Sequence, residues 1–90
     1  MNYRLTEHVQ DVMRERGIAV ETVEALLRNP QQVVPASNGR KAFQSLLNLG
    51  GSKLYLIRAI LDDRTDPAVV VTVYRTTKIG KYWRDRESNL

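Results

Sequence analysis

The chain has 90 residues, of which 42% are hydrophobic and 27% are charged, and these values are typical of one globular domain, here residues 1–90. The absence of cysteine excludes disulfides and thiolate chemistry. Because the first residues lack the layout of a signal peptide and no apolar run is long enough to span a bilayer, we expect a cytoplasmic protein that does not contact membranes.

The chain is basic, with a formal net charge of +4 and a pI of about 9.8. This charge favours an anionic partner. Most of the excess lies in residues 75–90, which contain five basic and two acidic residues. Such a basic C-terminal segment is either a nucleic-acid-binding surface or a solvated face that keeps the protein soluble.

Two short helices are predicted in the first third of the chain. In residues 5–16, apolar side chains recur at helical spacing, Thr6 can cap the helix and Gly17 can end it. A second helix is predicted over residues 20–28, and it ends before Pro30 because a residue that precedes proline is disfavoured in helical conformation.

Up to four strands are predicted in the rest of the chain, separated by turn signals that include the pair Gly50-Gly51. Short connections favour antiparallel neighbours. We therefore predict an α+β fold, in which two N-terminal helices pack on one face of a three- to four-stranded antiparallel sheet. The predicted strands are residues 31–34, 41–49, 52–61 and 68–74.

The strand at residues 68–74 is the most apolar of these, and a basic, aromatic stretch follows it. Four cations recur there at every third position, and three aromatic side chains between and beside them can stack on bases. Alternatively, Tyr82 and Trp83 fold back and close the end of the core. The cations are Arg75, Lys78, Lys81 and Arg84, and the aromatic residues are Tyr74, Tyr82 and Trp83.

Arg58 interrupts a strand whose other residues are largely apolar. Since an unpaired buried arginine is costly, we expect either an acidic partner, Glu15 or an aspartate of residues 62–66, or a bound anion. We further expect Arg58 to converge with Arg75 and Lys78 on one hollow of the surface.

His8 is the only histidine, and a lone histidine without cysteines does not make a zinc site. We therefore predict no metal and no cofactor. The ordinary pKa of histidine suits a general base for RNA cleavage, although a histidine at the margin of a helix often only packs and makes one hydrogen bond.

Several short motifs, in this order, resemble a family of small bacterial domains of unknown function, which is itself similar to the BrnT-like and RelE-like toxins of toxin–antitoxin pairs. Many members of the family have arginine where this chain has Val12, and serine where it has Thr77. The motifs are His8 with Met13, Arg16-Gly17-Ile18, Asn29-Pro30, Gly39-Arg40-Lys41, Leu56-Ile57-Arg58, the stretch from Thr72 to Lys78, and Lys81-Tyr82-Trp83.

The resemblance implies helices on a small antiparallel sheet, endonucleolytic cleavage of RNA, and an antitoxin-like protein partner. Two alternatives stay open: a non-catalytic module that binds nucleic acid or a protein, and an interaction domain whose sheet edge pairs with a partner strand. The predicted catalytic residues are His8, Arg58, Tyr74, Arg75 and Lys78, and the predicted nucleic-acid-binding residues are Arg16, Arg40, Lys41, Lys81, Tyr82 and Arg84.

In this hypothesis the cleavage needs no metal, because the ribose 2′-hydroxyl attacks the adjacent phosphate. Arg58, Arg75 and Lys78 would stabilise the growing negative charge on the phosphate. Tyr74 or His8 would transfer protons, and the remaining cations would hold the RNA strand.

Overall fold

The computed structural model describes residues 2–48 and 50–85. Its elements, in chain order, are β1 (Tyr3–Leu5), α1 (Glu7–Glu15), α2 (Val20–Arg28), β2 (Gln32–Pro35), the short 3₁₀-helix η1 (Ser37–Gly39), β3 (Lys41–Asn48), β4 (Leu54–Asp62), β5 (Ala68–Thr76) and α3 (Ile79–Tyr82).

The strands form one sheet in the order β1-β5-β4-β3-β2, in which β1 runs parallel to β5 and the other neighbours are antiparallel. The α+β class is confirmed, but the sheet is mixed and has five strands, and the described residues include a third helix. The expectation of three or four antiparallel strands missed β1. Three residues are too few to show a strand pattern, and β1 depends on distant pairing with β5, where the Ala68 amide donates to the Asn2 carbonyl at 3.0 Å.

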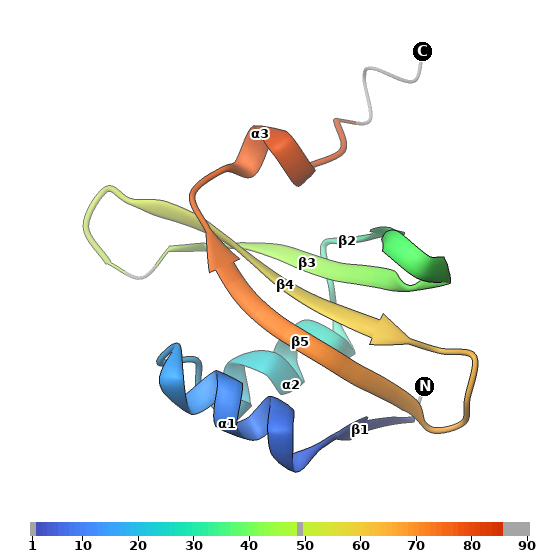
Figure 1. The fold of residues 1–90 in the computed structure, drawn as a ribbon. Coiled ribbons are helices and arrows are strands. Elements are labelled where there is room, and N and C mark those ends of the chain that lie inside the picture. The colour runs from blue at the N-terminus through green and yellow to red at the C-terminus, as the bar shows by residue number, and fades with distance from the viewer. Residues whose placement is uncertain (1, 49, 86–90) are drawn as a thin grey trace.

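Helices α1 and α2 lie on one face of the sheet, as Figure 1 shows. Apolar side chains from both helices pack there against β3, β4 and β5 and form the main core. The alternation of β4 agrees with the sequence, because Ile57, Ala59 and Leu61 all belong to this core. Val9, Met13, Val23, Leu26 and Leu27 are the buried residues that the two helices contribute.

The N-terminus of α1 forms as its sequence predicts. Thr6 has an extended backbone, and its hydroxyl oxygen accepts a hydrogen bond from the Val9 amide at 3.1 Å. The chain leaves the helix through Gly17, whose φ of +66° is strained for residues with a side chain. Helix α1 (Glu7–Glu15) is therefore shorter than the predicted helix over residues 5–16, whereas α2 has the predicted bounds, residues 20–28.

The C-terminal part of the chain crosses to the other face of the sheet. Helix α3 follows β5 and lies on the side opposite α1 and α2 (Figure 1). None of the helices in the described part of the chain has the length and hydrophobicity of a membrane span. The sheet therefore separates a face covered by α1 and α2 from a second face on which α3 lies.

We expect Thr6→Ala to lower the free energy of unfolding by about 1 kcal/mol, because the Val9 amide would lose its cap. Urea denaturation followed by circular dichroism measures the change. Thr77→Ala, at an exposed position outside the regular elements, is the control and should have a much smaller effect. Equal stability of the two variants would contradict the capping role.

Candidate functional site

Four polar side chains form a row across the face of the sheet that α1 and α2 leave uncovered. Each of them lies directly opposite the next on the neighbouring strand. They are Gln32 of β2, Gln44 of β3, Arg58 of β4 and Tyr74 of β5. Directly paired residues of a sheet project from the same face. We call these four residues the polar row.

Arg58 is the charged member of the polar row, and only 7% of its surface is exposed. Its Nε donates to Oε1 of Gln44 at 2.9 Å, and its Nη1 donates to the Tyr74 hydroxyl at 2.5 Å. The guanidinium carbon lies 4.0 Å from the centre of the Tyr82 ring, a cation–π contact. Arg58 is thus held by neutral groups.

The acidic partner expected for Arg58 is not observed. No ion pair shown between described residues includes Arg58. In the loop after β4, Asp62 is paired with Arg64 and lies near Arg40, and Asp63 is paired with Lys41. Because none of these carboxylates neutralises the buried Arg58 guanidinium, Arg58 is an attractive group for an anion.

Gln44 connects Arg58 to the C-terminal end of the described chain. Its side chain is fully buried, and its Nε2 donates to Oε1 of Gln32 at 2.8 Å and to the Tyr82 carbonyl at 3.1 Å. The Gln32 amide in turn accepts from the Arg84 backbone N–H at 3.0 Å and donates to the Arg84 carbonyl. Sequence reasoning missed both glutamines.

A signal for Gln44 was present in the sequence. Gln44 and Arg58 are equally distant from Gly51, and β3 and β4 form a hairpin whose register is centred on this glycine. Its φ of +66° fits a turn. A predicted hairpin with this centre would have placed Gln44 opposite Arg58.

A pocket of about 580 Å³ opens beside Arg58 on this face of the sheet, a volume within the range of small-ligand sites. Arg40 adds a second guanidinium, and its buried Nε has no hydrogen-bond partner among the described residues; the nearest carboxylate, of Asp62, is 3.9 Å away. The lining residues are Pro35, Ala36, Ser37, Arg40, Arg58, Ile60, Tyr74 and Tyr82. We call this cavity the Arg58 pocket.

Two tyrosines of the Arg58 pocket differ in acidity. Burial raises the pKa of the Tyr74 phenol above its ordinary value, although Arg58 beside it acts in the other direction. The Tyr74 hydroxyl lowers the pKa of Tyr82, and the charges of Lys81 and Arg58 add to this effect. The rings meet edge to face, with centres 6.3 Å apart. Tyr74 therefore keeps its proton to a higher pH than Tyr82 does.

The expectation that Arg58 and Arg75 share one hollow is wrong. Arg75 pairs with Ile57, a residue of the main core, and so projects toward the helices. There its guanidinium donates to the carbonyls of Arg16 at 2.8 Å and Gly17 at 3.3 Å, at the C-terminal end of α1. The cause is a bulge in β5, since Leu61 pairs with Val70 but Ile60 pairs with Thr72.

Two further predicted residues belong to the helix layer. His8 is exposed on α1, on the side of the sheet away from the Arg58 pocket. Arg16 follows α1, and its Nη1 donates to the Val73 carbonyl at 2.7 Å and to the Thr72 hydroxyl at 3.3 Å. The structure therefore does not bring His8, Arg16 or Arg75 together with Arg58.

The remaining predicted cations do not share one face of the sheet. Lys41 pairs across the sheet with the core residue Leu61 and so projects toward the helix-covered face, whereas Lys78, Lys81 and Arg84 follow β5 in the chain. Lys78 is exposed in the link between β5 and α3, and Lys81 lies with its Nζ 5.3 Å from the Tyr82 ring centre. Arg84 is exposed and attached through its backbone to Gln32. Lys41 is paired with Asp63 at 2.6 Å. Tyr82 packs over Arg58, so the ring closes the polar row rather than the main core.

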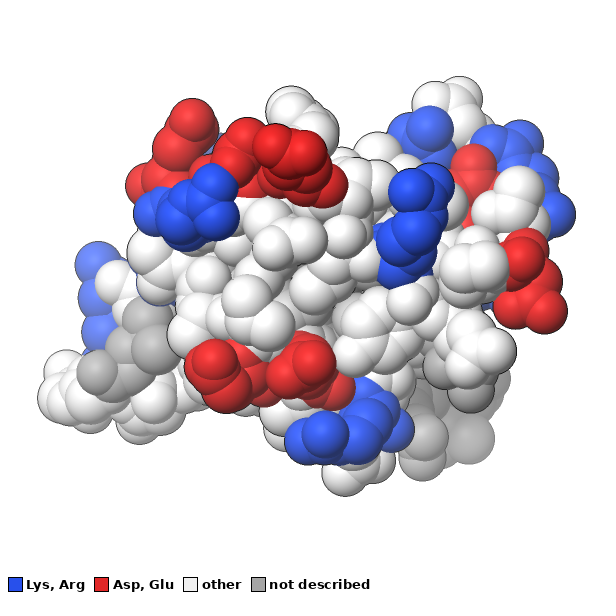
Figure 2. All heavy atoms as spheres, turned by 90° about the horizontal axis from the view of Figure 1, so that it is seen from below, with Lys and Arg blue, Asp and Glu red and all other residues white. Residues whose placement is uncertain are grey.

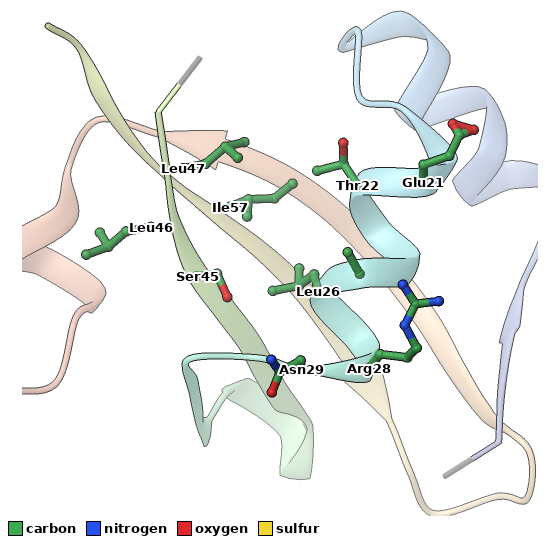
Figure 3. A pocket seen from close by; sticks show the side chains of 10 residues that line it. Glu21, Thr22, Leu26, Arg28, Asn29, Ser45, Leu46, Leu47 and Ile57 are labelled. Atoms are coloured by element: carbon green, nitrogen blue, oxygen red, sulfur yellow. The ribbon is translucent and has the colours of Figure 1, made fainter. Parts of the chain in front are cut away.

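The helix-covered face offers a different surface. Figure 2, viewed from that side, shows clusters of acidic and of basic side chains interspersed on it. A second pocket, of about 680 Å³, lies there between α2 and β3, with Leu26, Leu47 and Ile57 among its apolar lining residues (Figure 3). It contains none of the predicted site residues, so the Arg58 pocket is the candidate site.

Comparison with known proteins places the chain in a family. A family model described as a domain of unknown function (DUF4258) matches residues 5–75, and the chain therefore belongs to this family. The matched residues include the whole polar row, whereas α3 and Arg84 follow them. No curated protein and no solved structure matches the chain.

We expect Arg75→Ala to lower the free energy of unfolding by about 1 kcal/mol, because the carbonyls at the end of α1 would lose a charged donor. Urea denaturation measures the loss, and Arg4→Ala, at an exposed position of β1, is the control. A stability equal to that of the wild type would show that the contact between Arg75 and α1 is dispensable.

Asp62 should contribute to the pH dependence of stability. Its carboxylate accepts hydrogen bonds from the side chain and backbone of Arg64, and these lower its pKa well below the ordinary value. The stabilisation is therefore present at neutral pH and is lost as the pH falls below about 4 and the carboxylate becomes protonated.

Asp62→Asn should accordingly reduce the difference between the free energies of unfolding measured with urea at pH 7 and at pH 3. Glu24→Gln, on the exposed surface of α2, is the control, and it should leave more of this difference intact. An Asp62→Asn variant with the wild-type difference would remove Asp62 as a source of acid sensitivity.

Proposed function

We propose that this domain binds RNA in the Arg58 pocket, as the resemblance to RelE-like and BrnT-like toxins implies. The observation that supports the proposal best is the buried guanidinium of Arg58, which lies in a pocket wall and is held by neutral groups. A phosphate oxygen supplies the negative charge that these neutral partners lack, and charge-assisted hydrogen bonds to arginine are among the strong ones.

The other lining residues fit the same ligand. Arg40 contributes a second guanidinium to the pocket wall, and Tyr74 and Tyr82 contribute aromatic rings. Proteins that bind single-stranded RNA commonly combine cations for the phosphates with aromatic faces for the bases. The pocket volume of about 580 Å³ also suits one nucleotide unit of a longer strand.

The uncovered face suits RNA better than the helix-covered face. Acidic side chains are interspersed with basic ones on the helix-covered face (Figure 2), and they would repel phosphates. Arg16 and Arg75 on that side donate to backbone carbonyls of the protein itself. We therefore assign RNA contacts to Arg40, Arg58, Lys78, Lys81 and Tyr82, and structural roles to Arg16 and Arg75.

Metal-independent cleavage of the bound RNA is a second candidate function. The specific observation in its favour is the pair of tyrosines whose pKa values are displaced in opposite directions beside Arg58. In this reaction the phenolate form of Tyr82 accepts the proton of a ribose 2′-hydroxyl and becomes the phenol, while the ribose oxygen bonds to the adjacent phosphorus. The 5′-oxygen leaves with a proton from Tyr74, and Arg58 stabilises the negative charge on the phosphate. The products are a 2′,3′-cyclic phosphate and a 5′-hydroxyl end.

A protein partner that adds a strand to the sheet has less support. One edge strand, β2, ends in Pro35, which has no amide hydrogen for a ladder. At the other edge, β1 covers only the first residues of β5, and in the rest of β5 the Val73 carbonyl already accepts a hydrogen bond from Arg16. An antitoxin-like partner is thus proposed only through the family resemblance.

Binding of a single-stranded RNA oligonucleotide, measured by fluorescence anisotropy at several salt concentrations, tests the main proposal. We expect Arg58→Gln to weaken binding by about tenfold or more, because a charge-assisted contact is lost. The slope of log affinity against log salt concentration should become shallower by the amount expected for about one phosphate contact. Arg40→Gln, at a half-buried position of the pocket wall, should also weaken binding even if Arg58→Gln perturbs folding.

Arg28→Gln on the exposed surface of α2 is the matched control and should bind RNA like the wild type. Wild-type affinity in both pocket variants would contradict the proposal. The same oligonucleotide, incubated in the presence of a metal chelator, tests cleavage: a 2′,3′-cyclic phosphate product that Tyr74→Phe strongly reduces would support the second candidate function, and intact RNA would leave a binding module.

A further inference from the structure

On the basis of the proposed function, we infer that Gln44 and Gln32 are positioning residues that hold the C-terminal segment over Arg58 and thereby complete the RNA site. The C-terminal segment is defined here as residues 79–85, which include α3. The inference concerns how the site is assembled, and neither glutamine needs to touch the RNA.

The hydrogen bonds of the C-terminal segment carry the first part of the argument. Within the described residues, three hydrogen bonds attach its backbone to the sheet, and each of them uses one of the two glutamine side chains. Gln44 holds the Tyr82 carbonyl, and Gln32 holds both the N–H and the carbonyl of Arg84. The glutamines therefore replace a strand partner for this segment.

The C-terminal segment has little stability of its own. Helix α3 has only four residues, and an isolated helix of this length does not form in water. Its position must therefore come from contacts with other parts of the protein, which include the glutamine hydrogen bonds, the packing of the Tyr82 ring over Arg58 and the edge-to-face contact of Tyr82 with Tyr74. When the segment is released, the Arg58 pocket loses Tyr82 from its wall.

The orientation of the Gln44 amide links the segment to Arg58. Its oxygen accepts from Arg58, and its nitrogen donates to Gln32 and to the Tyr82 carbonyl. One planar group thus orients the guanidinium and holds the segment at the same time. Because RNA binds best when both are in place, RNA binding and seating of the segment should stabilise each other.

The neutral charge of Gln44 is part of this role. A glutamate of the same shape would accept from Arg58, but it would neutralise the guanidinium and present an acceptor to two groups that now accept hydrogen bonds. Gln44→Glu should therefore release the segment and weaken RNA binding more than the neutral Gln44→Met. Lowering the pH should partly restore binding to Gln44→Glu, because the protonated carboxyl can donate again.

The experiment uses the full chain and two independent measurements. Trp83 is the single tryptophan of the chain and lies half-buried within the C-terminal segment, so quenching of its fluorescence by acrylamide reports whether the segment is seated. RNA affinity is measured by anisotropy as above. The variants are Gln32→Ala, Gln44→Met and Gln44→Glu, and Gln10→Ala on exposed α1 is the control.

We expect stronger quenching of Trp83 in the three variants and wild-type quenching in the control. RNA affinity should fall about fivefold in Gln32→Ala, which corresponds to the loss of about 1 kcal/mol of hydrogen bonding, and further in Gln44→Glu. Gln32 is half-buried at the sheet edge, so Gln32→Ala keeps the test valid if the Gln44 variants do not fold. RNA should also protect Trp83 from acrylamide in the wild type.

Unchanged Trp83 quenching in folded variants would overturn the inference and leave the proposed function intact. Stronger quenching with wild-type RNA affinity would also overturn it, because the segment would then not complete the site. If the wild type binds no RNA, the proposed function itself fails, and the glutamines are then only structural.

Discussion

The arrangement of the uncovered face depends on one contact, in which the buried Arg58 guanidinium is held by the neutral side chains of Gln44 and Tyr74. Burial of a cation among neutral groups is unfavourable, so each of its hydrogen bonds matters to the native state. The row exists because four strands place one polar residue each at the same level of the sheet. The register of the sheet, more than any single side chain, therefore determines the chemistry of this face.

The two faces of the sheet divide the positive charge of the protein. On the helix-covered face, the side chains of Arg16 and Arg75 connect the end of α1 to β5. Arg16 donates to the Val73 carbonyl of β5, and Arg75 donates to the carbonyl of Arg16. On the uncovered face, the guanidinium of Arg58 is held by neutral groups and that of Arg40 carries an unpaired N–H. The hydrogen-bond partners of each cation therefore indicate the binding surface better than the net charge of +4 does.

Local sequence signals predicted the elements that local interactions stabilise. The Thr6 cap, the glycine after α1 and the proline after α2 define both helices, and the alternation of β4 identified the residues that face the core. Tyr74, Tyr82 and Arg58, which their chemical type predicts as site residues, all line the Arg58 pocket. In contrast, β1 depends on pairing with the distant β5, and the orientation of Arg75 depends on the bulge in β5, so no local pattern predicts either. Gln44 is predictable only once the β3–β4 hairpin is centred on Gly51.

The bulge in β5 determines which side chain lies opposite Arg58. With regular pairing beyond Val70, Tyr74 would lie opposite Ile57 and turn toward the helices, and Val73 would lie opposite Arg58. Arg75 would lie opposite Leu56, on the same face as Arg58. Arg58 would then face a valine, which cannot accept the hydrogen bond that the Tyr74 hydroxyl now accepts. One inserted residue in β5 thus decides whether a tyrosine or a valine lies opposite Arg58, so strand length matters as much as residue identity when other members of the family are compared.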